Sequence, residues 1–399
     1  MKNLTCTPAT IQAPTVPGAD IHTLSAAWVT NYTSFAPGDF NYNGGDVAVQ
    51  SAKFCNITVT YTHPGYNDNI TVETWLPASE QWNGRLQAIG GGGWAAGRFP
   101  LTGVFMDGAL GEGYATTTTD AGLGLDTQGP LDWALLSPGN FDYVTLNNFA
   151  ARALNDQALI GKGLIQSFYG RAPEYSYWSG CSQGGRQGMM LAQRYPTAYD
   201  GIAASAPAQS ITKFTSNLYY PIFMRLWHGV DPLTCELDYL TKEAIKACDP
   251  LDGVTDGLIS NMTACNYDPY TAVNKTFECA GLNRTIPLSQ GAALVAQAAW
   301  SGAHTTDGRQ LWYGYNPGTD ITKFGAVPGQ NSSIPSEDMW FNLFGAKNAS
   351  FDTFAMSHEQ YQEAFHSITQ EFSSMFDAAD PDLSAFKAAG GKLITYHGL

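Results

Sequence analysis

The chain has 399 residues, of which 44% are hydrophobic and only 14% are charged, and its formal net charge is -15. This length allows two or three domains, or one large core with an insertion. An apolar stretch of about 18 residues or more, as a membrane-spanning helix needs, does not occur. The 20 Lys and Arg residues in an acidic chain argue against a nucleic-acid partner, whose phosphates require clustered positive charge.

Glycosylation and cysteine signals indicate a secreted protein. Nine Asn-x-Ser/Thr sequons favour a glycosylated product, although an Asn- and Thr-rich chain also contains such triplets by chance. Seven cysteines fit an oxidising compartment, and their odd number leaves one thiol without an internal partner. Residues 1–6 lack the apolar segment of a signal peptide, so we expect a removed signal or an incomplete N-terminus. The sequons begin at Asn3, Asn31, Asn56, Asn69, Asn261, Asn274, Asn283, Asn331 and Asn348.

The first predicted elements are strands. Residues 55–61 alternate between apolar and polar side chains, and residues 70–76 repeat the pattern after a turn-rich segment, which predicts an antiparallel hairpin. A third strand, 86–89, runs into four consecutive glycines at 90–93, where the chain must turn. Residues 114–119 are Thr-rich and predict a further strand.

A strand, a sharp turn, a helix and a second strand follow. Residues 149–169 carry apolar side chains at helical spacing and end at Gly170 as a helix does. The strand 175–179 leads into a glycine-flanked serine, a helical run that stops before Pro196, and an apolar strand 201–206. This βαβ pattern predicts a parallel, buried sheet.

After Pro207 the composition and the hydrophobic pattern of the sequence change. Sequons, four cysteines and Asp-Gly turns crowd a region that shows no clear strand alternation until residue 392. Its length is about that of a domain, which indicates an insertion. Within it, residues 236–246 and 359–376 predict helices, and residues 392–396 predict a strand that returns to the sheet.

The segment Gly180-Cys181-Ser182-Gln183-Gly184 carries the strongest chemical signal. Flanking glycines allow a strained strand-to-helix turn that exposes the serine hydroxyl, and the helix N-terminus behind it stabilises developing negative charge. Alone, this pattern is common by chance. Its place between a predicted strand and a predicted helix favours a nucleophile, Ser182, over a glycine-rich connector whose serine only caps the helix.

Acyl transfer at Ser182 also requires two backbone donors for the oxyanion. The residue after the nucleophile, Gln183, supplies one. The glycine loop 90–93 stands where the second donor is expected, and we predict Gly91 or Gly92 for this role, with a simple tight turn as the alternative.

The segment 177–188, YWSGCSQGGRQG, and its continuation to Ile202 resemble the nucleophile region of the tannase and feruloyl esterase family. The similarity extends from about Cys6 to the last residue. It implies an α/β fold, an α/β-hydrolase core with an inserted lid domain. We assign residues 1–207 to the first part of the catalytic core, 208–375 to the lid with a calcium loop, and 376–399 to an incomplete return to the core.

In this family a cysteine before the catalytic serine pairs with a cysteine directly after the catalytic histidine, and Cys181 occupies the first of these places. None of the seven histidines is followed by cysteine. Residues 380–398 resemble the family segment that leads into the catalytic aspartate. We therefore expect the catalytic Asp and His, and the partner of Cys181, to lie beyond Leu399, and a structural role for His397.

A second signal lies in the insertion, where residues 248–258 place three aspartates among Asp-Gly turns. Such a loop can supply the oxygen ligands of Ca²⁺ or form plain turns, and it is not an EF-hand because Ser260 replaces the bidentate Glu. The family resemblance implies a structural Ca²⁺ held by the side chains of Asp249, Asp252 and Asp256 and the carbonyls of Val254 and Leu258.

Spacing alone does not determine the cysteine pairs. As a working hypothesis, we expect Cys6 to pair with Cys55, which would tie the N-terminus to the first strand, and Cys248 with Cys265, which would close the aspartate-rich loop. Cys235 with Cys279 is the pair that remains.

The function implied by the resemblance is that of a secreted serine carboxylesterase, in which Ser182 attacks an ester carbonyl and water releases the acid. The substrate is a small aromatic ester or a phenolic ester of plant cell walls. We favour hydroxycinnamoyl (feruloyl-type) esters over the galloyl esters of tannases and over terephthalate monoesters, although the sequence does not choose among them. A protein of another class, a calcium-dependent carbohydrate-binding glycoprotein that keeps the fold without catalysis, is the alternative.

Overall fold

A computed structural model of the chain describes residues 4–41, 43–125, 129–327 and 338–398. It divides into two compact units. The first unit comprises residues 1–210 and 374–398, and the second unit comprises residues 211–373. The predicted role of the inserted region as a lid stays a prediction.

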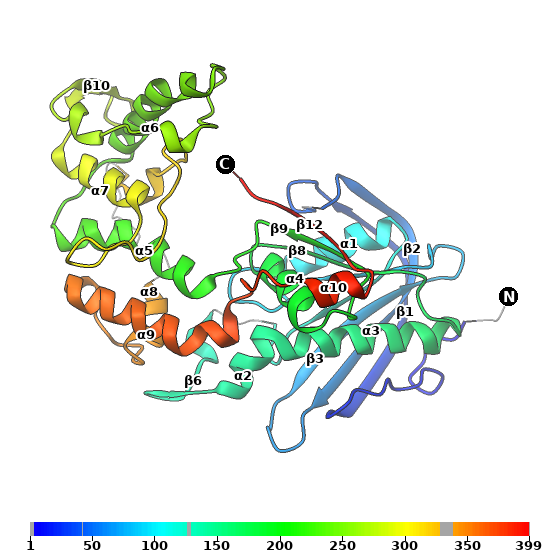
Figure 1. Cartoon of the computed structure of the whole chain (residues 1–399). Coiled ribbons are helices and arrows are strands. Elements are labelled where there is room, and N and C mark those ends of the chain that lie inside the picture. The colour runs from blue at the N-terminus through cyan, green and yellow to red at the C-terminus, as the bar shows by residue number, and fades with distance from the viewer. Residues whose placement is uncertain (1–3, 42, 126–128, 328–337, 399) are drawn as a thin grey trace. The chain divides into compact units, whose positions relative to one another are not determined.

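One eight-stranded sheet organises the first unit, in the order β1-β2-β3-β5-β4-β8-β9-β12 (Figure 1). The β1, β2, β3 and β5 strands pair antiparallel, whereas β5, β4, β8, β9 and β12 pair parallel. This mixed sheet with helices on both faces is the α/β-hydrolase arrangement that we predicted. The strands are β1 (Asp20–Ala36), β2 (Val47–Thr62), β3 (Ile70–Pro77), β4 (Leu86–Ile89), β5 (Ala115–Thr119), β8 (Ser176–Cys181), β9 (Gly201–Ser205) and β12 (Lys392–Tyr396).

The predicted hairpin is confirmed as β2 and β3, with Ile57 opposite Thr74 and Val59 opposite Val72. The return strand β12 pairs with β9 as expected. The first strand, β1, was missed. Its pairing with β2 shifts register at three places between Ile21 and Ser34, so irregularities interrupt the two-residue alternation that reveals a strand.

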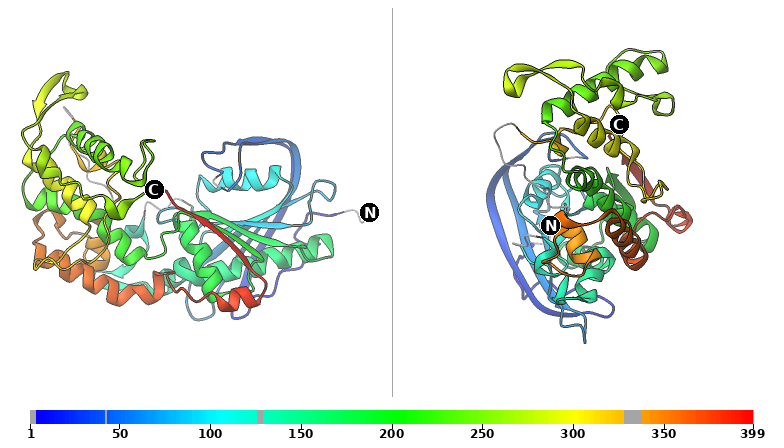
Figure 2. Two further views of the ribbon diagram at one scale, coloured as in Figure 1. Left: turned by 45° about the horizontal axis from the view of Figure 1, so that its top comes forward. Right: turned by 90° about the vertical axis from the view of Figure 1, so that its left-hand side faces the viewer.

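Helices cover the two faces of this sheet. On one face, α1 (Thr102–Gly111) packs Met106, Ala109 and Leu110 against Phe54 and Trp75 of the strands. The opposite face carries α3 (Ala153–Tyr169) and α4 (Gln183–Arg194) (Figures 1 and 2). The remaining short elements of this unit are α2 (Tyr143–Asn147), α10 (Ser384–Ala388) and a small sheet of β6 (Leu135–Ser137) and β7 (Asn140–Phe141).

The helix predicted over 149–169 begins later than expected. A π-helical turn, Asn148–Arg152, precedes α3, which then ends at Gly170 in the left-handed conformation as predicted. The carbonyls of Phe149 and Ala150 accept hydrogen bonds from the buried Arg186 guanidinium, at 3.3 and 3.0 Å. These side-chain bonds satisfy carbonyls that a widened turn leaves available, and such turns often mark functional sites.

The second unit is mainly helical. The helices predicted over 236–246 and 359–376 are confirmed as α6 (Thr234–Cys248) and α9 (His358–Phe376). The sequence missed α5 (Ile211–Trp227), which has Pro221 in its interior, and also a two-stranded sheet, β10 (Thr276–Cys279) with β11 (Arg284–Pro287). The other helices are α7 (Gln290–Ser301) and α8 (Asp338–Trp340).

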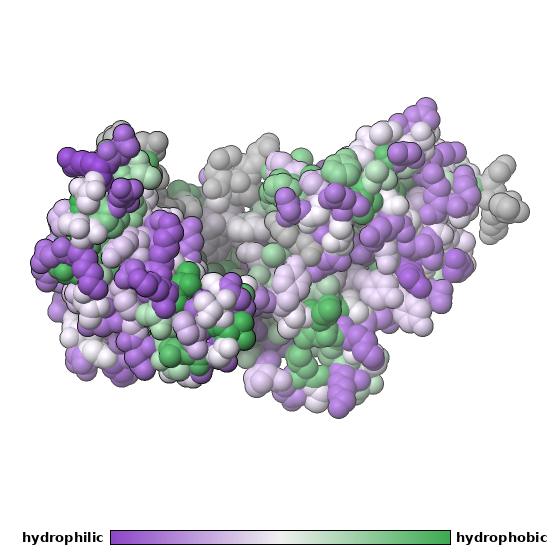
Figure 3. Space-filling model, turned by 90° about the horizontal axis from the view of Figure 1, so that it is seen from above, coloured by the Kyte–Doolittle hydropathy of each residue, from purple (hydrophilic) through white to green (hydrophobic). Residues whose placement is uncertain are grey.

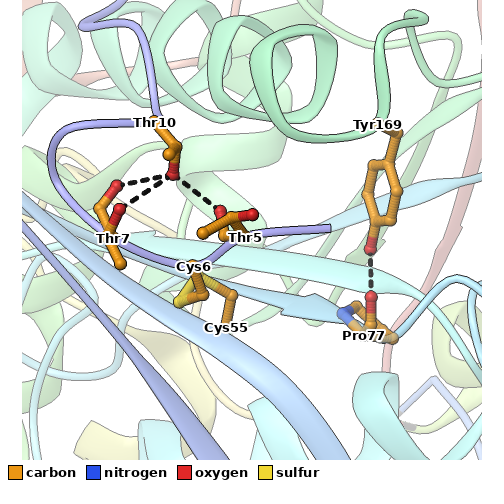
Figure 4. The surroundings of a disulfide bond; sticks show 7 residues. All are labelled: Thr5, Cys6, Thr7, Thr10, Cys55, Pro77 and Tyr169. Atoms are coloured by element: carbon orange, nitrogen blue, oxygen red, sulfur yellow. Dashed lines mark hydrogen bonds between the residues drawn. A yellow bond between two sulfur atoms is a disulfide. The ribbon is translucent and has the colours of Figure 1, made fainter. Parts of the chain in front are cut away.

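All three expected disulfides are present. Cys6–Cys55 ties the N-terminal segment to β2, and Thr10 Oγ1 beside it donates to the carbonyl of Thr5 at 2.8 Å (Figure 4). The other two lie in the second unit: Cys235–Cys279 joins α6 to β10, and Cys248–Cys265 closes the aspartate-rich loop.

No helix in the described part of the chain combines the length and hydropathy that a membrane span needs. On the face drawn in Figure 3, hydrophobic residues form separate patches among hydrophilic ones. This distribution agrees with the burial of the large apolar side chains inside each unit.

Candidate active site

The predicted sharp turn at Ser182 is confirmed. Ser182 stands between β8 and α4 with φ 59° and ψ -112°, a backbone conformation that is strained for a residue with a side chain. Its side chain is exposed and makes no capping hydrogen bond to the helix. A capping role therefore does not explain this serine, whereas a strained turn that exposes a hydroxyl is the geometry of a nucleophile elbow.

Glycines make this turn possible. A Cβ on Gly180 would lie 2.5 Å from the carbonyl oxygen of Gly184, and a Cβ on Gly184 would lie 2.9 Å from the carbonyl oxygen of Gly91. The first turn of α4 therefore packs backbone to backbone against the glycine loop 90–93. Ser182 and this loop line one cavity of about 290 Å³.

A buried glutamine decides between the two candidate donors in the loop. Gln187, which is fully buried, accepts a hydrogen bond from Gly91 N–H at 2.9 Å and donates through Nε2 to the carbonyl of Ala96 at 2.6 Å. Because this bond engages Gly91 N–H, Gly91 is not available as an oxyanion donor. Gly92 remains the candidate, together with Gln183 N–H at the start of α4.

Arg186 lies directly behind the nucleophile turn. Its guanidinium is fully buried, donates from Nε to Gln183 Oε1 at 2.8 Å and from Nη1 to the carbonyls of Ala150 and Phe376 at 3.0 and 3.1 Å. Burial, and secondly the nearby Arg194, lower its pKa to about 9. A buried positive charge in the first turn of α4 adds to the helix dipole that favours an anion at this end.

Sequence reasoning named neither Arg186 nor Gln187 as a functional residue. The available signal was their place beside Gly184, Gly185 and Gly188 at the start of the helix, where long polar side chains must find buried partners. The prediction used this motif only for its serine, so both residues were missed.

The described histidines do not complete a catalytic triad. No histidine among the described residues forms a hydrogen bond or ion pair with Ser182. His397 is exposed at the end of β12, with Nδ1 3.1 Å from the carbonyl of Gly398, and its predicted structural role stays a prediction. Cys181 carries the free thiol, and burial raises its pKa.

The aspartate-rich loop lies in the second unit, after α6. The carboxylate of Asp249 is buried and accepts hydrogen bonds from Asp256 N–H and Gly257 N–H at 3.2 and 3.0 Å. Asp252 accepts from Val254 N–H at 2.9 Å, and Asp256 accepts from Leu258 N–H at 3.0 Å. The described residues contain no cluster of three or more His, Cys, Asp or Glu side chains arranged to hold a metal. The donor types suit Ca²⁺, but the carboxylates are turned toward backbone amides.

Comparison with known proteins identifies the family. Residues 55–399 match the model of the family described as tannase and feruloyl esterase. The chain belongs to this family. It is 38% identical over 403 residues to a probable feruloyl esterase of Arthroderma benhamiae, an alignment that covers 98% of this chain and 72% of that protein. It is 27% identical to a tannase of Aspergillus oryzae, with 90% of this chain and 68% of that protein covered.

Solved structures of the tannase and feruloyl esterase family share the fold. A tannin acyl hydrolase from Aspergillus niger superposes with a TM-score of 0.82 at 28% identity and covers 98% of this chain and 73% of its own. Feruloyl esterase B from Aspergillus oryzae superposes with a TM-score of 0.72 at 23% identity, with 96% and 72% of the two chains covered. The α/β-hydrolase fold and an esterase function follow from this membership.

Replacing Gln187 by leucine tests the hydrogen bonds behind the glycine loop. Gln187→Leu leaves Gly91 N–H and the Ala96 carbonyl without partners, which we expect to lower the free energy of unfolding by about 1–3 kcal/mol. Because the glycine loop is then no longer held in position near Ser182, kcat for an aryl ester falls about 10- to 100-fold while KM changes little. The exposed Gln166→Leu is the matched control, and an unchanged kcat in Gln187→Leu would contradict this role.

Proposed function

We propose that the protein is a serine carboxylesterase that hydrolyses aromatic esters through an acyl-enzyme. Ser182 Oγ attacks the ester carbonyl carbon, the alcohol leaves with a proton, and water then releases the acid and restores the serine. The observation that carries the proposal is the strained, exposed Ser182 at a cavity that the glycine loop also lines. Gln183 N–H and Gly92 N–H stabilise the oxyanion. The base and its orienting acid are not assigned to any described residue.

Hydroxycinnamoyl, or feruloyl-type, esters are the substrate class that we favour. The support is the ranking of relatives, since the probable feruloyl esterase of A. benhamiae is 38% identical to this chain and the A. oryzae tannase 27%. A hydrolase of mono(2-hydroxyethyl) terephthalate from Piscinibacter sakaiensis is also 30% identical, with 84% of this chain and 64% of that protein covered. Aromatic acids are thus common to the named relatives.

Substitution of the nucleophile tests the esterase directly. Ser182→Ala removes the attacking oxygen, and we expect kcat for methyl ferulate to fall by at least about 10³-fold. Ser25→Ala on the exposed strand β1 is the control and should retain full activity. Hydrolysis by Ser182→Ala at the wild-type rate would exclude this mechanism. A carbohydrate-binding protein without catalysis, the alternative class, would bind a feruloylated sugar but show no turnover in either form.

We also propose a structural Ca²⁺ in the loop closed by Cys248–Cys265. Asp249, Asp252 and Asp256 would supply carboxylate oxygens and Val254 and Leu258 carbonyl oxygens, which is a hard-oxygen set suited to this ion. Support comes from the donor types in one short, disulfide-closed loop and from Gly253 and Gly257, whose positive φ angles of 94° and 87° let the loop fold tightly. The ion would stabilise the second unit without entering the reaction.

Calcium dependence of stability tests this site. A bound ion at 100 times its Kd stabilises the folded state by about 2.7 kcal/mol, so EDTA should lower the Tm and excess Ca²⁺ should restore it. The double variant Asp252→Asn, Asp256→Asn should lose this dependence, whereas Asp238→Asn on the exposed face of α6 should keep it. A wild-type Tm indifferent to both EDTA and Ca²⁺ would refute the site.

Secretion and glycosylation complete the proposal. The sequons at Asn31, Asn69, Asn274, Asn283 and Asn348 lie on exposed asparagines, as glycan attachment requires. Asn56 is half-buried and donates through Nδ2 to Glu73 Oε1 at 3.2 Å. Asn3 and Asn331 lie outside the described residues.

Glycan mapping of protein secreted from a eukaryotic host should find occupancy at the exposed asparagines and none at Asn56, because its amide nitrogen is engaged. Peptides released before and after removal of N-glycans would report each site by mass. A chain that carries no glycan at any exposed sequon, or that fails to leave the cell, would contradict the secreted assignment.

A further inference from the structure

The cavity beside Ser182 has a mainly apolar wall. Its apolar lining consists of Ile89 at the end of β4, Phe99 and Leu101 from the segment that leads into α1, and Phe105 in α1. The glycine loop and the end of β8 line it as well. Ile89 is buried and the two phenylalanines are half-buried. With about 290 Å³ beside the nucleophile, the cavity is close in size to the smaller ligand pockets of proteins.

This apolar wall begins at the predicted oxyanion donor. A Cβ on Gly92 would lie 3.3 Å from Cζ of Phe99, so the phenyl ring occupies the space next to Gly92 that a side chain would need. An ester whose carbonyl oxygen binds Gly92 N–H therefore has Phe99 as an immediate neighbour. Sugar hydroxyls would lose hydrogen bonds on this surface, whereas an aromatic acyl group would gain from its burial.

Some polar side chains that line the cavity already have hydrogen-bond partners. Asn43 donates to Ser179 Oγ at 2.9 Å and accepts a hydrogen bond from Ser205 Oγ, so it and Ser179 are already paired. Asn41 donates through Nδ2 to the carbonyl of Gly45 at 2.9 Å. Asn41 Oδ1 accepts no hydrogen bond from any residue that the structure describes.

The position of Asn41 is fixed by close packing. Its amide group lies where a Cβ on Gly44 would approach to 2.5 Å and a Cβ on Gly108 to 2.8 Å, so these two glycines leave the space that it fills. The residue is only 8% exposed, yet it reaches the cavity. An amide oxygen that is fixed in place and has no donor can accept a hydrogen bond from a hydroxyl group on an otherwise apolar ligand.

We propose that this cavity is the acyl subsite, in which Phe99, Leu101 and Phe105 hold the ring of an aromatic acyl group and Asn41 accepts a hydrogen bond from a hydroxyl on that ring. The proposal rests on the esterase function above. It assigns the alcohol part of the ester to a position outside this cavity, and it makes Asn41 the residue that selects hydroxylated over unsubstituted rings.

Three methyl or aryl esters separate these contributions in assays of the full-length protein: methyl cinnamate, methyl 4-hydroxycinnamate and 4-nitrophenyl acetate. In Leu101→Ala and Phe99→Leu, kcat/KM for both cinnamates should fall about 10-fold, while the value for the acetate changes less than about threefold, because acetate leaves the ring contacts unused. Leu101 is 45% exposed, so its truncation should not unfold the protein, and Leu136→Ala at an exposed position of β6 is the control.

Asn41→Ala gives the second readout. It should lower kcat/KM for the hydroxylated ester about 10-fold relative to the unsubstituted one, since only the former loses a hydrogen bond. Equal losses for all three esters, or an unchanged preference in every variant, would overturn the acyl subsite. Absence of Ser182-dependent turnover of any ester by the wild type would instead overturn the proposed function, so the two failures are distinguishable.

Discussion

The close approach of two backbones, the first turn of α4 and the glycine loop after β4, is the constraint on which the site depends. Any side chain at Gly184 would meet the carbonyl of Gly91 at 2.9 Å, and any side chain at Gly185 would meet the carbonyl of Ser205 at 2.4 Å. Because the helix must begin in this narrow space, the chain turns sharply at Ser182. The same contact brings the glycine loop and Ser182 to one cavity.

A positive φ at a serine costs about 1–3 kcal/mol and persists only where the surroundings enforce it. Here the enforcement comes from buried polar side chains. Gln187 holds the glycine loop through hydrogen bonds with Gly91 and Ala96. Arg186 bonds to Gln183, to the π-helical turn before α3 and to the carbonyl of Phe376. The strained turn is thus held from three separate parts of the first unit, which explains why long polar residues lie among glycines.

Much of this architecture follows from local sequence. The alternation in β2 and β3, the glycine that ends α3 and the glycine-flanked serine each carry a short-range signal, and the structure agrees with all of them. The first strand gave no such signal because its register shifts interrupt the alternation. The hydrogen bond from Gly91 to Gln187 and the packing of Asn41 against Gly108 could not be predicted, since they join residues about 96 and 67 positions apart that only the fold brings together.

The aspartate-rich loop 248–258 of the second unit shows a different limit of prediction. Its donor atoms are adjacent in sequence, yet their arrangement around an ion depends on how each carboxylate is turned, and a composition of aspartates and glycines does not specify that. Ser182 differs because its exposure comes from the backbone conformation of the turn and does not depend on a side-chain rotamer.

Covalent labelling with a serine-directed fluorophosphonate tests the central claim most directly. The protein that hydrolyses an aryl ester should gain the mass of one phosphonyl group, and peptide mapping should place it on Ser182, with a parallel loss of activity. Full labelling on another residue, or complete inactivation with Ser182 unmodified, would contradict the account.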